Sequence, residues 1–360
     1  MWIRCLEITG VRNVAQARLE FDPRLNLFLG ANGAGKTTVL EALYLLSRAR
    51  SFRGPGVRSL IADGATCLQV YGELVADDQV TRIGVGRGPR GLDMRLDGQP
   101  CDSLAALSAC CPMRVVDPSA HELVQGPPEG RRRYLDWGVF HVEPAFLTAW
   151  RRYQGALRQR NAALRANPGD RRAVEAWDSE LLIQARTVTE ARRRYVAGLE
   201  GTVGQLLAAL AWDGGPVSMV LEPGWPAETD LETALREGWA RDRARGFTGV
   251  GPHRADLSLR VNHAPAAGRL SRGQQKIMAL ALLLAQAVRL REDRGRAPIL
   301  LLDDVVAELD RVRRVAVFEL LGRLEGQLFV TAVEVPPEGL AWAGTSREFH
   351  VEQGTIQPVV

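Results

Sequence analysis

The chain has 360 residues, which is enough for two domains or for one domain with a large insertion. Hydrophobic residues make up 46% of it, so a sizeable core is expected, but no apolar run approaches the roughly 20 residues that a membrane-spanning helix needs. The formal net charge of +4 permits binding to nucleic acid without requiring it. The start of the chain carries charges and no signal-peptide core, so we expect a soluble cytoplasmic protein without a membrane partner.

A glycine-rich turn follows the first predicted hairpin, which covers residues 1–21. An apolar strand, Leu25–Leu29, leads into the turn, and a helix is predicted from Lys36 to Leu46. The turn fits G-x-x-x-x-G-K-[ST] at every fixed position and continues into Thr38. Its residues are Gly30, Ala31, Asn32, Gly33, Ala34, Gly35, Lys36 and Thr37.

The spacing of this turn suits the binding of nucleotide phosphates. Glycines allow consecutive backbone N–H groups to face phosphate oxygens, and the following helix adds its N-terminal dipole. The Lys36 ammonium can reach the β- and γ-phosphates of ATP, and the Thr37 hydroxyl can ligate Mg²⁺. Lysine occurs only at Lys36 and Lys276 among 46 Lys and Arg residues, so a compact ammonium is retained here. A chance match is the alternative, but the flanking strand and helix favour the phosphate site.

Strand patterns continue through the next part of the chain. Alternating runs between residues 67 and 98 predict an antiparallel sheet with a hairpin at Asp97–Gly98. Met113–Val116 is predicted to be a further short strand, which Asp117–Pro118 stops.

A helical arm is predicted after this strand-rich part. Helices are expected at Ala145–Arg165 and from Arg171 to about Ala197, and the breaker Asn167–Asp170 between them predicts an antiparallel helical hairpin. Between Phe146 and Gly198 the sequence has 11 arginines and five acidic residues. Such an arm could neutralise nucleic-acid phosphates, or it could simply present a solvated helix face.

Strand and helix patterns alternate again towards the C-terminus. A strand is predicted at Val217–Leu221, a helix at Leu231–Arg245, and strands after Gly246. The segment Ser271–Gln275 then opens an apolar helix, Ile277–Leu290, so this helix N-terminus is a second potential phosphate cradle. An ordinary serine cap is the alternative.

A continuous apolar run, Ile299–Leu302, ends in two carboxylates at Asp303 and Asp304. Such runs are typical of a strand buried on both faces of a parallel sheet, where ligands bind at the carboxyl ends of the strands. We therefore expect both aspartates beside the phosphate loop, where one holds Mg²⁺ and the next polarises the attacking water. Alternatively, they only end the strand and cap the next helix. A further strand is predicted at Gln327–Ala332.

The phosphate loop, the segment Leu270–Lys276 and the acidic strand end together resemble the ABC-type ATPase heads. Their order, with a helical arm inserted before the second element, is similar to that of the chromosome-maintenance and double-strand-break-repair ATPases. More closely still, the whole chain resembles the RecF family of bacterial recombination mediators. The segments that carry this resemblance are Gly30–Thr38, Gly130–Gly138, Gln159–Leu164, Gly251–Leu257, Leu270–Lys276 and Leu302–Asp310.

The resemblance implies an α/β fold of the P-loop NTPase class, a two-lobed ABC-type ATPase head with an inserted short helical arm. The head would comprise residues 1–120, which carry the phosphate loop, and residues 246–360, which carry the signature and the acidic strand end. Residues 121–245 would form the mainly helical arm domain.

The resemblance also implies a function in recombinational DNA repair. ATP would join two copies into a symmetric homodimer on single-stranded DNA or on single/double-strand junctions, with slow DNA-stimulated hydrolysis. RecR and RecO would be partners in loading recombinase at gaps. Asp304 stands where these heads carry the catalytic glutamate, and Lys36 would assist it. Ser271, Gly273 and Gln274 would bind the γ-phosphate that the other subunit's loop holds.

Several residues depart from the wider ABC pattern, and they fit slow turnover in which ATP serves mainly as a dimerisation switch. Arg272 stands where most transporters have glycine in the signature, and Thr331–Ala332 occupy the region of the missing switch histidine. Ala307–Asp310 match the dimer-contact loop, with alanine in place of its usual serine.

Two further segments are candidates for the nucleotide site. The segment His253–Asp256 either lines the site or forms a polar turn, and Arg12–Asn13 would lie near the nucleotide.

Two other functions compete with DNA repair. A transporter ATPase subunit would use the same motifs, but the helical stretch Pro144–Leu210 and the missing switch histidine argue against it. A metabolic kinase would use the phosphate loop and would leave Leu270–Lys276 unexplained.

Overall fold

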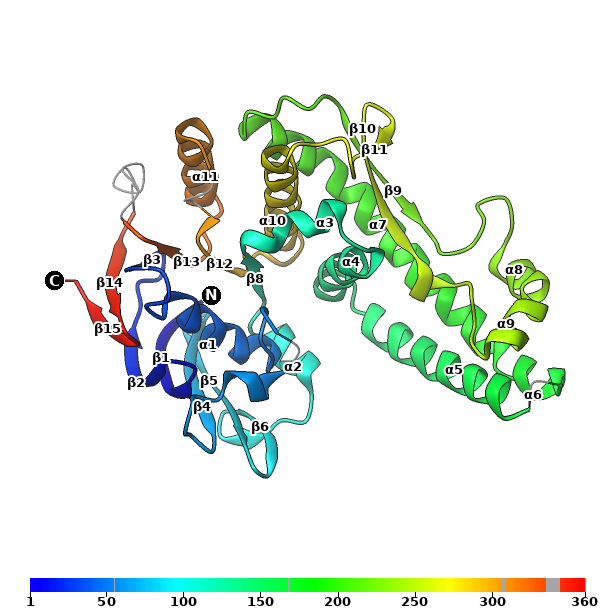
Figure 1. Ribbon diagram of the computed structural model, residues 1–360, viewed down its shortest axis with the longest axis horizontal. Coiled ribbons are helices and arrows are strands. Elements are labelled where there is room, and N and C mark those ends of the chain that lie inside the picture. The colour runs from blue at the N-terminus through cyan, green and yellow to red at the C-terminus, as the bar shows by residue number, and fades with distance from the viewer. Residues whose placement is uncertain (55, 168, 306–308, 335–343, 360) are drawn as a thin grey trace. The chain divides into compact units, whose positions relative to one another are not determined.

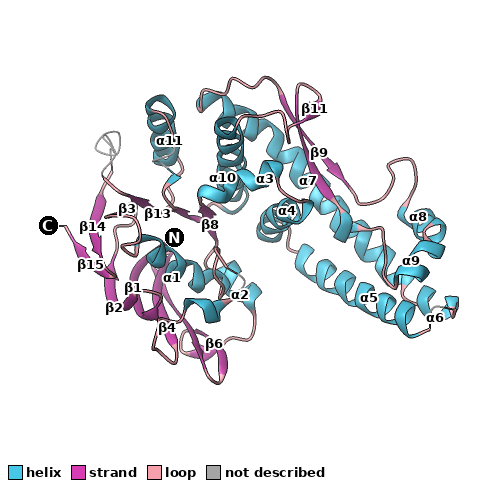
Figure 2. Ribbon diagram, in the orientation of Figure 1, coloured by secondary structure: helices cyan, strands magenta, loops and turns pink. Residues whose placement is uncertain are grey.

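The computed structural model describes the whole chain except residues 55, 168, 306–308, 335–343 and 360 (Figure 1). The chain folds into two compact units, each built from several segments. Unit 1 comprises Met1–Ala120, Ala209–Ala211 and Leu290–Val360, and unit 2 comprises His121–Ala208 and Trp212–Arg289. Strands dominate unit 1 and helices dominate unit 2 (Figure 2).

The compact units divide the chain differently from the predicted domains after residue 245. Residues 246–289 lie in unit 2 with the helical arm, not in unit 1. They do so because strand β10 (Asp256–Val261) pairs along its length with β9 (Val217–Glu222). The Tyr134 hydroxyl of α4 (Pro128–Val142) also donates to the Leu282 carbonyl of α10 (Arg272–Arg294), at 2.9 Å. The division into an ATPase head and an arm as functional parts stays a prediction.

Unit 1 contains an antiparallel sheet in the order β2-β1-β4-β5-β6-β7. The first two strands form the predicted N-terminal hairpin, and the alternating runs after residue 67 form the rest of the sheet, so both predictions are confirmed. The strands are β1 (Trp2–Val11), β2 (Val14–Glu20), β4 (Leu68–Ala76), β5 (Gln79–Gly88), β6 (Gly91–Leu96) and β7 (Gln99–Pro100).

The second sheet of unit 1 is mainly parallel and has the order β15-β14-β3-β13-β12-β8. The strand that precedes the phosphate loop, β3, lies between β13 and β14, and β12 lies on the other side of β13. The two C-terminal strands were not predicted. The strands are β3 (Leu25–Leu29), β8 (Met113–Val116), β12 (Ile299–Leu302), β13 (Leu328–Ala332), β14 (Ser346–Glu352) and β15 (Thr355–Pro358).

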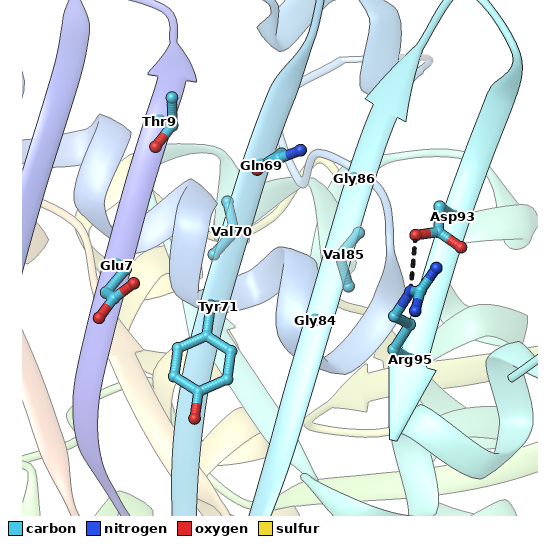
Figure 3. A pocket seen from close by; sticks show the side chains of 10 residues that line it. All are labelled: Glu7, Thr9, Gln69, Val70, Tyr71, Gly84, Val85, Gly86, Asp93 and Arg95. Atoms are coloured by element: carbon cyan, nitrogen blue, oxygen red, sulfur yellow. Dashed lines mark hydrogen bonds and ion pairs between the residues drawn. The ribbon is translucent and has the colours of Figure 1, made fainter. Parts of the chain in front are cut away.

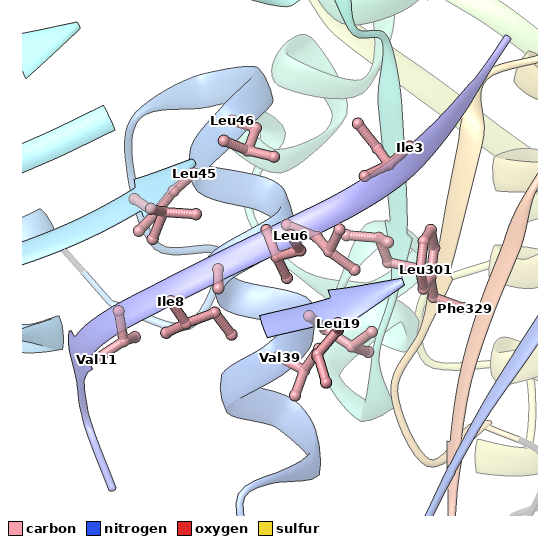
Figure 4. Close-up of a cluster of buried hydrophobic side chains, with 14 of the residues drawn as sticks. Ile3, Leu6, Ile8, Val11, Leu19, Val39, Leu45, Leu46, Leu301 and Phe329 are labelled. Carbon is pink, nitrogen blue, oxygen red and sulfur yellow. The ribbon is translucent and has the colours of Figure 1, made fainter. Parts of the chain in front are cut away.

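Helix α1 (Lys36–Arg48) anchors the phosphate loop in the core of unit 1. It contacts β1, β4 and β5 of the antiparallel sheet and β13 of the parallel sheet. Its apolar side chains, including Val39 and Leu46, pack with Leu6 of β1, and Leu301 and Phe329 join the same cluster (Figure 4). Because the helix is enclosed by apolar side chains, the loop at its N-terminus is held in a fixed place.

Unit 2 is built on two long antiparallel helices, α5 (Phe146–Ala166) and α7 (Asp178–Ala209), which confirm the predicted helical hairpin. The predicted second helix is divided after residue 175, however, and its main part begins at Asp178 and extends to Ala209. Arg160 of α5 bonds Asp178 at the start of α7, and Arg192 further along α7 stacks on Trp150. A small sheet, β11-β10-β9, lies in the same unit. None of the helices within the described part of the chain combines the length and apolarity needed to cross a membrane.

The remaining elements connect these sheets and long helices. Helix α4 was not predicted, and the predicted helix 231–245 is divided by Gly238 into α8 and α9. These elements are η1 (Val57–Leu60), α2 (Leu104–Cys110), η2 (Pro118–His121), α3 (Glu122–Gln125), α6 (Arg171–Glu175), α8 (Leu231–Glu237), α9 (Trp239–Arg245), η3 (Pro252–Arg254), β11 (Ala264–Pro265) and α11 (Arg311–Arg323).

Candidate nucleotide-binding site

The phosphate loop joins β3 to α1, and two of its glycines are required by the backbone. Gly30 has φ 156°, and a Cβ there would lie 2.1 Å from the Val351 carbonyl oxygen of β14. Gly35 has φ 119°, and a Cβ there would lie 3.0 Å from the Asn13 side chain. Residues 31–33 at the middle of the loop are exposed, so their backbone amides are open to a ligand.

Lys36 begins α1 and turns its side chain back into the loop. Its ammonium donates to the carbonyl oxygens of Gly30, at 2.7 Å, and Ala31, at 3.1 Å, and only 4% of the residue is exposed. A buried ammonium held by neutral carbonyls keeps an unneutralised charge next to the free amides of a helix N-terminus. That combination attracts phosphate, as the motif predicts.

Arg12 and Asn13, at the turn between β1 and β2, support the loop from the side. The Asn13 amide donates to the Ala34 carbonyl at 3.1 Å, and its oxygen accepts from the Thr38 hydroxyl at 2.9 Å. Arg12 is a left-handed residue with φ 48°, and its guanidinium forms an ion pair with the buried Glu41 of α1. Both residues therefore lie beside the loop, and Arg12 acts on it through α1.

Asp303 lies directly beside the phosphate loop. The strands β3, β13 and β12 run parallel, so their carboxyl ends meet at one edge of the sheet. The Thr37 hydroxyl donates to the Asp303 carboxylate, with oxygen distances of 2.8 and 3.1 Å. The predicted proximity of Asp303 to the phosphate loop is thus confirmed, whereas the backbone N–H of Asp304 bonds Thr331.

The environment of Asp303 fits a divalent cation. Only 2% of the residue is exposed, and this burial raises the pKa of its carboxyl, whereas hydrogen bonds from Thr37 and Thr331 lower it. A hydroxyl and a carboxylate that converge on one point are the oxygen ligands that Mg²⁺ prefers. A bound cation would also offset the burial of the charge.

Thr331, at the end of β13, connects the two aspartates, whereas the sequence indicated only that it stands in the region of the missing switch histidine. Its hydroxyl accepts a bond from the Asp304 backbone N–H at 2.9 Å and lies 3.0 Å from the nearer Asp303 oxygen, to which it donates. Asp304 itself is left-handed, with φ 51°, at the turn after β12. The signal that could have found Thr331 is a hydroxyl at the carboxyl end of the strand between β3 and β12.

The signature residues Ser271, Gly273 and Gln274 lie in unit 2, at the start of α10. Ser271 and Gln274 cap this helix reciprocally: the Ser271 hydroxyl accepts from the Gln274 N–H at 3.2 Å, and the Gln274 side chain accepts from the Ser271 N–H at 3.0 Å. Ser271 and Gly273 are exposed. The cap accounts for the local geometry, and binding of a partner's γ-phosphate stays a prediction. Residues 307 and 308 of the predicted dimer-contact loop lie outside the described residues.

The segment around η3, which was expected either to line the site or to form a polar turn, has internal partners in unit 2. Arg131 forms a bidentate ion pair with Asp256, with a closest distance of 2.7 Å. His253 bonds the Tyr153 hydroxyl at 2.6 Å and the Thr248 carbonyl at 3.0 Å. Burial lowers the pKa of His253 to about 4. These contacts fit the polar turn.

A separate shallow depression of about 250 Å³ lies on the antiparallel sheet of unit 1 (Figure 3). It is lined by residues of β1, β4, β5 and β6, among them Tyr71 and the Asp93–Arg95 ion pair. It includes none of the predicted site residues, so the candidate site remains the phosphate loop with Asp303.

Comparison with known proteins shows the family to which this chain is similar. The family model described as the RecF/RecN/SMC N terminal domain matches residues 2–337. The DNA replication and repair protein RecF of Stenotrophomonas maltophilia (strain R551-3) is 42% identical over 365 residues, which cover the whole of both chains. The protein of the same name from Pseudomonas putida (strain W619) is 40% identical over 360 residues, which cover 99% of this chain and 98% of that one.

Solved structures of related proteins have a similar fold. The recombination mediator protein RecF with ATP, from the RecFOR pathway, is 25% identical, with a TM-score of 0.87 over 100% of this chain and 98% of that chain. The Smc head domain with an extended coiled coil from Pyrococcus furiosus, bound to the C-terminal domain of ScpA, is 16% identical, with a TM-score of 0.61 over 99% and 96% of the two chains. The latter likeness concerns the fold alone. Together these matches confirm the predicted α/β ATPase-head fold.

Proposed function

Because the chain belongs to the RecF family, within the RecF/RecN/SMC group of ATPase heads, we propose that it is an ATP-dependent DNA-binding protein of recombinational repair. The observation that carries the proposal is the hydrogen bond between Thr37 and Asp303. It joins the phosphate loop to a buried carboxylate at the carboxyl ends of the parallel strands. The relatives' names support DNA repair over the transporter-subunit and kinase alternatives.

We assign the nucleotide to the phosphate loop of unit 1. The amides of residues 30–38 and the Lys36 ammonium bind the phosphates of ATP, and the ammonium exchanges its loop carbonyls for phosphate oxygens. Thr37 and Asp303 would hold Mg²⁺, which supplies neutralisation of the charge on the phosphates. Asp304 orients the attacking water and accepts its proton, and Thr331 fixes the turn that carries Asp304.

We further propose that ATP serves mainly as a dimerisation switch. Ser271, Gly273 and Gln274 of one copy close over the nucleotide held by the other, which gives a symmetric homodimer on DNA with slow, DNA-stimulated hydrolysis. The solved RecF structures belong to the RecFOR pathway, so RecR and RecO are the partners that we assign. We assign the protein to the cytoplasm, where it would promote the loading of recombinase at gaps in DNA.

Lys36→Met tests the nucleotide assignment. The variant loses the ammonium, so it should lose ATP binding in a fluorescent-nucleotide titration and ATP-driven dimerisation in sedimentation. Lys36→Arg is the matched control: it keeps the charge but not the compact ammonium, and it should bind ATP more weakly than the wild type. A Lys36→Met variant that still dimerised normally with ATP would overturn the proposal.

Asp304→Asn tests the hydrolytic assignment separately. The amide cannot accept the proton of the attacking water, so hydrolysis should slow while ATP binding persists. Because the switch would then stay closed, the variant should remain dimeric for longer after ATP is added. Normal phosphate release by this variant would remove Asp304 from the mechanism.

A further inference from the structure

Helix α5 has an unusual charge composition. Its 21 residues contain five arginines and no acidic residue. Two of these arginines are neutralised by acids of other elements. Arg152 pairs with Glu180 at 2.6 Å, and the buried Arg160 pairs with Asp178 at 2.8 Å and Asp242 at 3.0 Å.

The other three arginines form a stripe on one face of α5. Arg151, Arg158 and Arg165 are seven residues apart, a spacing at which a helix returns to nearly the same face. All three are exposed, and the described residues provide no ion pair for any of them. Arg165 has one long bond, at 3.5 Å, to the Gly246 carbonyl. We call these three residues the arginine stripe.

The surroundings of the arginine stripe leave its charge open to a ligand. Gly155 and Ala162 lie between the arginines on the same face, so the α5 positions between the guanidinium groups carry only small side chains. Some exposed arginines of the same unit are held by carboxylates instead: Arg171 pairs with Glu175 at 2.6 Å and Arg193 with Glu190 at 2.9 Å. The stripe is therefore a concentration of positive charge for which the described part of the chain provides no ion pair.

We propose that the arginine stripe binds the phosphate backbone of nucleic acid without reading its sequence. The inference rests on the proposed function and assigns it a surface on unit 2. The stripe extends about 21 Å along the helix, which corresponds to about six base-pair steps of a duplex. Guanidinium groups match phosphate geometry, and the small residues between them offer no apolar centre of the kind that a protein partner would bury. Figure 1 shows α5 beside α7 in this unit.

The test compares two triple variants that lose the same charge. The stripe variant is Arg151→Gln with Arg158→Gln and Arg165→Gln. The matched control is Arg171→Gln with Arg193→Gln and Arg194→Gln, in which each arginine has a carboxylate partner. Binding of the full chain to fluorescent duplex and single-stranded DNA is measured with ATP over a series of salt concentrations, and thermal melting checks that each variant is folded.

The stripe variant should bind DNA more weakly and should lower the slope of log affinity against log salt by about 2 to 3, since each phosphate contact contributes about 0.7 to 0.9. The control should change the slope by less than about 1. Replacing the three stripe arginines by lysine should restore the slope, because the charge returns. Equal slopes for the stripe variant and the control, or an unchanged slope in the stripe variant, would overturn the inference. A wild-type chain that binds no DNA at any salt concentration would overturn the proposed function itself.

Discussion

Replacing Thr331 by valine removes one hydroxyl from the candidate site and leaves the shape of the side chain nearly unchanged. That hydroxyl accepts from the Asp304 N–H at 2.9 Å and donates to Asp303 at 3.0 Å, and the residue has no exposed surface. In the variant, the Asp304 N–H has lost its acceptor and Asp303 has lost one of its donors. Each such loss at a buried group costs about 1–3 kcal/mol.

The effect on catalysis follows from the position of Asp304. Its left-handed turn, with φ 51°, is fixed by the bond to Thr331, and loosening the turn lets the carboxylate move. A displacement of about 1 Å in a catalytic group costs on the order of 100-fold in rate. We therefore expect kcat to fall about 10- to 100-fold. ATP affinity should change little, because the hydrogen bonds of Lys36 do not involve Thr331.

Single-turnover phosphate release and fluorescent-nucleotide binding separate these two effects. Thr331→Ser keeps the hydroxyl and is the matched control, so it should retain most of the turnover. A valine variant that hydrolyses ATP at the wild-type rate would refute the positioning role. A serine variant as slow as the valine variant would refute it too, because packing rather than the hydroxyl would then be responsible.

Three further substitutions probe the loop, the core of unit 2 and its pH dependence. Gly30→Ala should abolish ATP binding in a nucleotide titration, because its Cβ would lie 2.1 Å from a β14 carbonyl oxygen; normal binding would show that the loop tolerates a side chain. Arg160→Met leaves the buried Asp242 and the partly buried Asp178 without their partner, so urea unfolding should show a loss of about 3–5 kcal/mol; a loss below about 1 kcal/mol would contradict this. Burial lowers the pKa of His253 from 6.5 to about 4, so the folded protein holds this proton less tightly than the unfolded chain. The unfolding free energy should therefore fall by up to about 3 kcal/mol as the pH drops from about 6.5 to 4, and His253→Asn should flatten this dependence; an unchanged slope in the variant would assign the effect to other groups.

Two parts of the nucleotide site could be predicted from the sequence: the phosphate loop, from its local spacing, and Asp303, from the rule that ligands bind at the carboxyl ends of parallel strands. The phosphate loop follows from the fixed spacing of Gly30, Gly35, Lys36 and Thr37. The proximity of Asp303 follows because parallel strands end at one edge of a sheet. The hydrogen-bonding role of Thr331 was not predicted because it depends on β13 lying between β3 and β12, a long-range pairing that no local pattern reveals.

Ion pairs in the helical arm could not be predicted from the sequence either. The sequence predicts two helices and an excess of arginine between residues 146 and 198, but not which arginines are neutralised. The partner of Arg152 is 28 residues away and one partner of Arg160 is 82 residues away, so the pairing depends on the folded packing of α5, α7 and α9. The assignment of residues 246–289 to unit 2 likewise depends on the distant pairing of β9 with β10.

Sedimentation velocity of the wild type and Ser271→Arg, each with and without ATP, tests the central claim most directly. An ATP-dependent dimer is expected for the wild type only. Ser271→Arg should stay monomeric while it binds ATP normally in a titration, because Ser271 acts on the nucleotide of the other copy. A wild type that stays monomeric with ATP and DNA, or a Ser271→Arg variant that dimerises, would contradict the account.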